Sequence, residues 1–282
     1  MTLASKSPSD LTVPIRNIRF NRDPAKQPRW WHGGDPVATA FFNALSCTFP
    51  EGEKFFMDSV RHYRDVAPRE LKEQIRGFIG QEAVHSREHA AFNALAREAG
   101  YDVAKLEDGT RRSLAIGRRR AKVKQLAVTC ALEHFTAILA HGLLRADSKD
   151  MDGAPEDAAR LWSWHAMEEI EHKAVAYDTF LMVTRSWWAP RRYLLRVMAM
   201  VTATLILFHR IGANMASLYR EDGINTPRTW LRTIRYLVWS PGILRRVFLD
   251  YLTYYRPGFH PWDHDDRALL AATERKYGLA VA

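Results

Sequence analysis

The chain has 282 residues, of which 47% are hydrophobic and 26% charged, with only 15 Gly and 13 Pro. This length and composition indicate a folded globular protein of one large or two small domains, and they exclude disordered, fibrous and low-complexity chains. The formal net charge of +9 is uneven, because residues 181–282 contain 15 Lys and Arg against 7 Asp and Glu and so carry +8 of it. The same third of the chain contains five of the nine tryptophans.

The cysteines and the N-terminus indicate a cytoplasmic protein. Cys47 and Cys130 lie in apolar stretches without paired spacing, which favours reduced core thiols over a disulfide or a zinc motif. Residues 1–20 contain no uninterrupted apolar run after a basic start, so we expect a mobile Pro/Ser-rich arm rather than a signal peptide. The longest uncharged apolar run, residues 197–208, is shorter than the ~20 residues that a bilayer requires, and we predict no transmembrane span.

Apolar residues recur at steps of three and four throughout the long segments, which predicts an all-α protein. The long predicted helices are, in chain order, residues 36–66 with a kink at Pro50, 68–100, 112–146 and 156–187. Four long helices with shorter connections predict a bundle, followed by two or three further helices interrupted at 222–227 and 257–261. We expect an N-terminal arm at residues 1–30, the bundle at 31–190, and a basic, Trp-rich helical region packed on it at 191–282.

Ionisable residues lie on the apolar stripe of each long helix, where charges are unfavourable unless they pair or bind metal. Glu-x-x-His occurs on this stripe twice, once in the second helix and once in the fourth. Glu53 is in phase with the stripe of the first helix, whereas Glu51 points about 160° away from it. The inward-facing polar residues are therefore Glu53; Glu82, His85 and His89; Glu133; and His165, Glu169 and His172.

One Glu from each of two helices and Glu-x-x-His from each of two others is the ligand set of ferritin-like di-iron or di-manganese carboxylate bundles. Four carboxylates balance two divalent cations and can bridge them, while two neutral imidazoles leave coordination positions open. We therefore predict a ferritin-like four-helix bundle with a dinuclear metal site and additional C-terminal helices. The predicted metal ligands are Glu53, Glu82, His85, Glu133, His165, Glu169 and His172.

Several histidines and one glutamate allow a second interpretation. His165 has the spacing of a third imidazole ligand, or it is a core histidine hydrogen-bonded to a ligand carboxylate. Glu168 is either an alternative ligand or, by preference, a carboxylate that orients an imidazole. His89 is a candidate ligand or proton relay, with a core histidine as the alternative, and we name Glu168 and His89 as candidate catalytic residues. His134, and the loop residues His260, Asp263 and His264, are expected to have packing and capping roles.

The strings FPEGEKFF, GQEAVHSREH, ALEHFTA, WHAMEEIEHK and YYRPGFHPWDH resemble the bacterial family catalogued as predicted metal-dependent hydrolases, from about residue 13 to residue 265. The ligand pattern resembles ferritin-like di-iron oxygenases. In particular, His165, Glu169 and His172 are similar to the fourth-helix motif of the arylamine N-oxygenases, in which the extra histidine is a metal ligand. This resemblance is confined to the ligands, so no substrate is implied by it.

Three classes of function fit this site. A di-iron oxygenase or desaturase-like oxidoreductase fits best, because aromatic residues near the ligands would supply a dry pocket. The alternative is a dinuclear metal-dependent hydrolase, and the third class is an iron-storing ferritin relative. The expected cofactor is a pair of iron ions, with manganese or zinc as alternatives. Nucleotide and covalent-hydrolase chemistry are excluded, because the chain has neither a Gly-rich phosphate loop nor a Gly-x-Ser-x-Gly elbow.

The basic, Trp-rich last third suits an anionic membrane surface or a nucleic acid, and a solvated basic face is the alternative interpretation. We expect a hydrophobic or lipid-derived substrate, an electron-donor protein, and peripheral contact with the inner membrane surface, whereas a core-covering helix is the alternative explanation of residues 197–208. No nucleic acid is expected as a partner, and a homodimer is compatible with the sequence.

Overall fold

The computed structural model describes residues 6–8, 10–20 and 28–279, and within them it is helical, with no β-strand. The predicted all-α class is confirmed. The helices are α1 (Pro36–Ser46), α2 (Phe49–Arg61), η2 (Arg64–Val66), α3 (Arg69–Glu98), α4 (Val103–Arg118), α5 (Lys122–Leu144), α6 (Glu156–His172), α7 (Val175–Val183), α8 (Ala189–Glu221), α9 (Pro227–Ile234), the π-helix η3 (Arg235–Trp239), α10 (Ile243–Thr253), η4 (Pro261–Asp263) and α11 (Arg267–Tyr277).

Three of the long predicted helices are each divided in two, which corrects their predicted bounds. The first is interrupted at residues 47–48, and Pro50 lies in the first turn of α2, where its missing N–H is not needed. The third ends at Arg118 and restarts at Lys122, because the Gln125 side chain donates hydrogen bonds to the carbonyls of Arg118 and Arg120. The fourth is interrupted between His172 and Val175.

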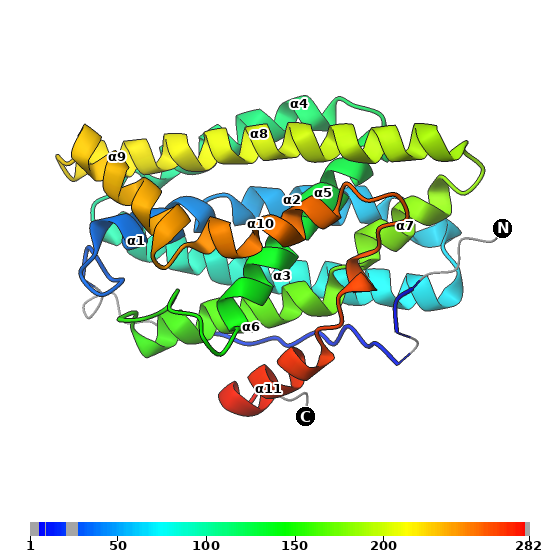
Figure 1. Ribbon diagram of the computed structural model, residues 1–282, viewed down its shortest axis with the longest axis horizontal. Helices are drawn as coiled ribbons and strands as arrows, with labels where there is room; N and C mark the ends of the chain where they lie inside the picture. The colour runs from blue at the N-terminus through cyan, green and yellow to red at the C-terminus, as the bar shows by residue number, and fades with distance from the viewer. Residues whose placement is uncertain (1–5, 9, 21–27, 280–282) are drawn as a thin grey trace.

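Helices α2, α3, α5 and α6 enclose the predicted ligands. Helix α2 packs on α3 and α5, and α6 packs on α5 and α3, so the four elements form a closed ring of contacts. The long helix α8 lies across one side of this group together with α4, and α10 packs on α5 (Figure 1). The ring agrees with a bundle around a metal site, whereas membership of the ferritin-like class remains a prediction.

The described part of the N-terminal arm is packed, which contradicts the expectation of a mobile arm for residues 13–20. It crosses the molecule beside α6 (Figure 1), and Arg16 within it is buried. The arm fits closely against α3 because two glycines leave room for it. A Cβ at Gly77 would lie 2.3 Å from the Val13 carbonyl oxygen, and one at Gly80 would lie 2.2 Å from Ile15 Cδ1.

Two helices, α5 and α8, are long and apolar enough to cross a membrane by length and composition alone. The most apolar window of α5 is 67% buried inside the protein, as expected of a core helix, but that of α8 is only 22% buried. In the sequence, Arg196 marks the N-terminal limit of the uncharged apolar run of residues 197–208. In the structure the helix continues through Arg196, whose side chain is buried against Tyr177 and the Arg256 carbonyl.

Replacement of Gly77 with Ala should displace the arm, because the new methyl group would overlap Val13. We expect a loss of about 1–3 kcal/mol in the free energy of unfolding and faster tryptic cleavage at Arg16. The matched control is Gly212→Ala in α8, where a Cβ would meet none of the described atoms within 4 Å and where Ala should stabilise the helix by up to ~1 kcal/mol. Equal effects of the two substitutions would contradict the packed arm.

Candidate metal centre

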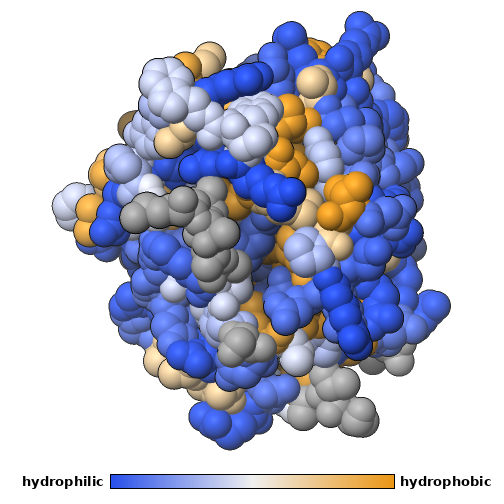
Figure 2. Space-filling model, turned by 90° about the vertical axis from the view of Figure 1, so that its right-hand side faces the viewer, coloured by the Kyte–Doolittle hydropathy of each residue, from blue (hydrophilic) through white to orange (hydrophobic). Residues whose placement is uncertain are grey.

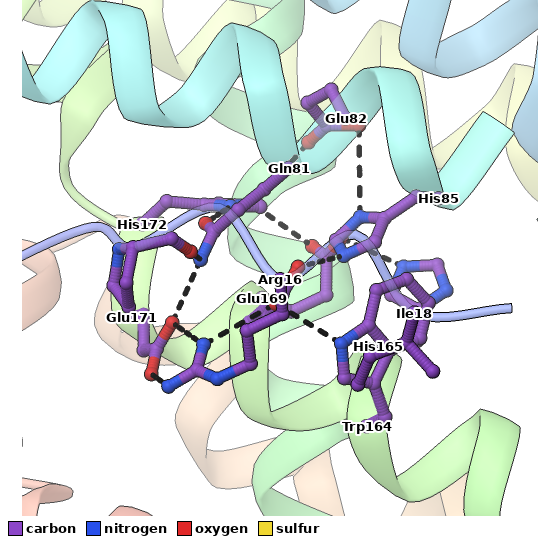
Figure 3. A network of polar contacts seen from close by, with 12 residues as sticks. Arg16, Ile18, Gln81, Glu82, His85, Trp164, His165, Glu169, Glu171 and His172 are labelled. Atoms are coloured by element: carbon purple, nitrogen blue, oxygen red, sulfur yellow. Dashed lines mark hydrogen bonds and ion pairs between the residues drawn. The ribbon is translucent and has the colours of Figure 1, made fainter. Parts of the chain in front are cut away.

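All seven predicted ligands converge in the interior of the helical ring. Each helix supplies its share: Glu53 comes from α2, Glu82 and His85 from α3, Glu133 from α5, and His165, Glu169 and His172 from α6. Every one of these side chains is buried. Figure 3 shows Glu82 and His85 on α3 facing His165, Glu169 and His172 on α6.

The ligands form two adjoining groups in which the candidate donor atoms lie within 4.8 Å of one another. One group consists of Glu82, Glu133 and His172, and the other of Glu53, His85 and His165. Glu82 also forms a group with His85 and Glu169, so it belongs to both sides. Such an arrangement suits two metal ions that share carboxylates.

Two carboxylates are oriented to bridge the groups. Glu169 directs Oε1 at His165 Nε2, 2.8 Å away, and Oε2 toward His172 Nε2 at 3.6 Å. Glu82 directs Oε1 toward His172 Nε2 at 3.3 Å and Oε2 toward His85 Nδ1 at 4.0 Å. Each of these glutamates therefore presents one oxygen to each side of the centre.

The tautomer of His172 is set by an amide whose own orientation is fixed. The Gln81 NH2 group donates to the Pro14 carbonyl and to Glu171, so its Oε1 must accept from His172 Nδ1, 2.9 Å away. Nδ1 therefore carries a proton, and Nε2 is the nitrogen that faces Glu82 and Glu133. Burial alone would lower the pKa of His172, but Glu169 and Glu133 raise it well above the usual range, so a metal ion must displace the proton on Nε2.

His85 is oriented in the same way by Glu168. Its Nε2 donates to Glu168 Oε2 at 3.0 Å, which leaves Nδ1 as the atom that faces the centre. Glu168 Oε1 accepts from the Trp164 indole and from Arg16, and Arg16 also forms a bidentate pair with Glu171 (Figure 3). Of the two roles predicted for Glu168, the contacts fit the carboxylate that orients an imidazole.

His165 is held by a chain of hydrogen bonds that includes His89. The Ser46 hydroxyl donates to Asn93 Oδ1, so it accepts from His89 Nδ1, and His89 Nε2 accepts from His165 Nδ1 at 2.5 Å. His165 Nε2, which lies 2.8 Å from Glu169 Oε1, is the nitrogen that faces the centre. This geometry suits a metal ligand for His165 and a positioning residue for His89.

The donor atoms of the centre are the test of whether metal ions fit. Among the described residues, both oxygens of Glu53, Glu82 and Glu133 are buried without a hydrogen-bond partner. The same lack of a hydrogen-bond partner holds for Glu169 Oε2, His85 Nδ1 and His172 Nε2. Buried polar atoms without partners are strongly unfavourable. Because these atoms point at one another from four helices, the residues fit a pair of divalent cations.

Burial and mutual repulsion hold protons on the centre when no metal replaces them. Burial raises the pKa of Glu53 and Glu82 well above the usual range and that of Glu133 to about 7. Burial alone would lower the pKa of His85, but hydrogen bonds to Glu168 and Glu169 raise it to about 9. Metal ions must displace these protons, so metal binding should weaken in acid.

Burial opposes ionisation of Glu169 too, but His172 and His165 outweigh it and hold the pKa of Glu169 well below its usual range. His165 differs from the other two imidazoles, because burial and the nearby His85 lower its pKa to about 4. A neutral His165 is the form that a metal ion requires.

The remaining ionisable residues discussed from the sequence lie outside the candidate centre. His134 Nε2 donates to the Asp250 carbonyl, and His260 and Asp263 form a capping box on η4. The His264 ring is hydrogen-bonded to Asp266 and contacts the His141 ring, not the candidate ligands. Glu51 pairs with Arg111, as expected of a residue directed away from Glu53.

Sequence reasoning missed Gln81, Asn93, Ser46 and Arg16, which orient the ligands. Gln81 and Asn93 could have been identified from the sequence, because amide side chains in the buried part of α3 need hydrogen-bond partners. Arg16 could not have been identified in this way, because Glu168 and Glu171, its partners, lie more than 150 residues away along the chain.

A cavity of about 270 Å³ reaches the centre at His165 and Glu169. Its inner walls are apolar and include Phe49, Phe55 and Phe56. Aromatic rings also surround the ligands: Phe78 lies edge-on to His172 with ring centroids 4.9 Å apart, and Trp164 lies edge-on to His85 at the same distance. The centre therefore has a dry approach shaped for an apolar molecule.

Replacing Glu53 with Gln should lower the metal content of the purified protein by about one ion per chain, because an amide oxygen is a weaker, uncharged ligand. Glu51→Gln is the matched control, two residues away on the same helix but paired with Arg111 at the surface. Elemental analysis measures both. Equal metal content in the two variants would contradict the assignment of Glu53.

The metal-free protein should lose stability as the pH rises from 7 to 9. In this window the unfolded chain has released the protons of its Glu and His side chains, whereas the folded protein retains one on His85, whose pKa is about 9. The raised pKa of Glu53 and Glu82 acts in the same direction. The free energy of unfolding then falls by about 1.4 kcal/mol per pH unit for each retained proton.

Thermal unfolding of the metal-depleted protein at pH 7, 8 and 9 measures this slope. Glu82→Gln removes one titrating carboxyl, so its slope should be smaller than that of the unsubstituted protein. A slope that does not change, or stability that rises with pH, would show that the buried groups are not protonated.

Comparison with known proteins agrees with a metal-dependent activity. Neither the curated proteins nor the solved structures include a significant match to this chain. A family model described as predicted metal-dependent hydrolase matches residues 14–265, which cover the whole centre and most of the helices. The chain therefore belongs to the family of predicted metal-dependent hydrolases.

Proposed function

We propose that this protein is an enzyme with two metal ions that oxidises a hydrophobic substrate with molecular oxygen, in the manner of an oxygenase or desaturase. The observation that carries this proposal is the set of buried donor atoms without partners at the end of an apolar cavity. Iron is the metal we propose first, with manganese or zinc as alternatives, and an electron-donor protein would complete the reaction.

The residues that would hold the pair are Glu82, Glu133 and His172 on one side, and Glu53, His85 and His165 on the other, with Glu169 between them. Bound iron would supply redox chemistry toward oxygen. The chain itself orients the three imidazoles through Gln81, Glu168 and His89. The apolar wall excludes water and places the substrate beside His165 and Glu169.

The mainly apolar lining of the cavity supports oxidation over attack on a carbonyl or phosphoryl group. Hydrolysis develops negative charge that is usually stabilised by hydrogen-bond donors. The Thr48 and Thr136 hydroxyls already donate to the backbone carbonyls of Leu45 and Glu133. Trp162 Nε1 and Arg210 Nε line the cavity without a hydrogen-bond partner among the described residues, and they are the donors that hydrolysis would use.

Metal-dependent hydrolysis is the second candidate, and the description of the family favours it. A dinuclear centre can activate water and polarise an ester or phosphate without protein donors. In that case two zinc or manganese ions would occupy the same residues, and the apolar cavity would hold the acyl chain of the substrate.

Metal analysis followed by two parallel assays separates the candidates. Protein loaded with ferrous iron without oxygen should consume oxygen when air is admitted, with a change in its near-ultraviolet spectrum. Zinc-loaded protein should not hydrolyse nitrophenyl esters of medium-chain acids above the background rate. Glu133→Gln is the control for protein-bound metal, and we expect at least a 100-fold lower rate of oxygen consumption from it.

Ester hydrolysis by the zinc form, without oxygen consumption by the iron form, would overturn oxidation in favour of hydrolysis. His165→Ala tests the third imidazole within the same assays. As a ligand, its loss should change the metal spectrum and abolish turnover while the helical content stays constant; a lower melting temperature with an unchanged spectrum would identify a core histidine.

A further inference from the structure

Exposed apolar side chains are concentrated on one part of the surface. Of the nineteen exposed large apolar side chains among the described residues, fifteen lie between Trp188 and Leu252. They belong to α8, α9, η3 and α10 and to the residue that precedes α8. By contrast, the end of the molecule seen in Figure 2 is mainly hydrophilic, with apolar residues in small patches.

Helix α8 is apolar on both of its faces. Its buried side faces the protein through residues such as Met200 and Ala203, while the opposite side carries Leu194, Met198, Val201, Leu205 and Phe208, all exposed. These five recur at steps of four and three, so they form one stripe along the helix. Arg196 is the single charged residue between Tyr193 and Phe208, and it points inward.

Helix α10 extends this surface. A hydrogen bond between the Tyr251 and Thr204 hydroxyls joins α10 to α8, and the Tyr193 hydroxyl of α8 donates to the carbonyl of Tyr255, two residues beyond α10. On α10, Leu249 is 74% exposed and Phe248 is 55% exposed. We define the apolar face as the exposed apolar residues of α8, α9, η3 and α10.

The charges around this apolar face are nearly all positive. Between Arg185 and Arg256 the exposed charged residues are eight arginines and one glutamate, Glu221. The arginines are Arg185, Arg191, Arg220, Arg228, Arg232, Arg235, Arg245 and Arg256. Trp188 and Trp239 are 76% and 73% exposed, and tryptophan is enriched where proteins meet the headgroup layer of a bilayer.

We propose that the apolar face docks on an anionic phospholipid membrane. Apolar side chains bordered by arginines match a surface in which acyl chains lie beneath negative headgroups. A second copy of this chain fits poorly, since a twofold interface would place the same arginines against one another. An exposed patch of this extent otherwise favours aggregation, which a membrane surface prevents by covering it.

The cavity of the candidate centre opens beside α8, at one of the residues of this face. Its exposed lining residues are Ile116 and Arg120, in and after α4, and Thr202 and Ile206 of α8, and Ile206 is also one of the exposed apolar residues of the apolar face. A lipid acyl chain would enter beside Ile206 and reach His165 and Glu169 through the cavity. The assignment of a lipid as the substrate rests on the proposed function, whereas docking on the membrane does not rest on it.

Vesicle flotation tests docking. The full-length protein should float with vesicles that contain phosphatidylglycerol at low salt, and at least about tenfold less with phosphatidylcholine alone or at high salt. Leu205→Glu combined with Leu249→Glu should weaken vesicle binding at least tenfold, and so should Arg228→Glu combined with Arg235→Glu.

Two control variants carry the same changes elsewhere. Val66→Glu alters an apolar side chain that is 73% exposed on η2, and Arg61→Glu combined with Arg69→Glu reverses two exposed charges on α2 and α3; both should float like the unsubstituted protein. Circular dichroism should confirm that each variant is folded.

Docking is overturned if the protein stays at the bottom with both vesicle types, or if the variants on the apolar face float as well as the controls. It is also overturned if the protein is a dimer in solution that Leu205→Glu with Leu249→Glu dissociates and that does not float. Flotation needs neither turnover nor a particular metal, so binding to vesicles by a protein without oxygen consumption would retain docking and reject the proposed function.

Discussion

Four carboxylates and three imidazoles lie together in the interior of this protein, and most of their inward-facing atoms have no partner among the described residues. A group of this kind is unstable unless cations or protons neutralise it, because buried charge without compensation is strongly unfavourable. The surrounding helices and hydrogen bonds hold these groups in positions where cations can neutralise them. Helices α2, α3, α5 and α6 each bring a carboxylate, and a second set of buried polar residues orients every imidazole with one nitrogen toward the centre.

That second set connects distant parts of the chain. Arg16 of the N-terminal arm reaches both Glu168 and Glu171 on α6, and Glu171 fixes the Gln81 amide that orients His172. The arm thus connects α3 and α6 through its contacts with both helices. Because its ion pairs are buried, loss of one partner would leave a charge without compensation near the centre.

The inward residues of the candidate metal centre could be predicted from the sequence, whereas some of the residues that orient them, such as Arg16, could not. Helical periodicity alone directs Glu82, His85, Glu169 and His172 inward and separates Glu53 from Glu51, since these depend on spacing within one helix. Gly117 is the local signal for the break after Arg118, where the Gln125 side chain caps the carbonyls of Arg118 and Arg120, whereas the break after His172 has no Gly or Pro beside it. The packed arm depends on contacts with Gly77 and Gly80 that no local pattern reveals.

Anomalous X-ray diffraction from crystals of the metal-loaded protein tests the account most directly, because it locates the ions without assuming a reaction. The account predicts two metal ions about 3.5–4 Å apart, with Glu82 and Glu169 between them and His85, His165 and His172 around them. A single ion, or ions bound outside this group of residues, would contradict a dinuclear centre and with it the proposed function.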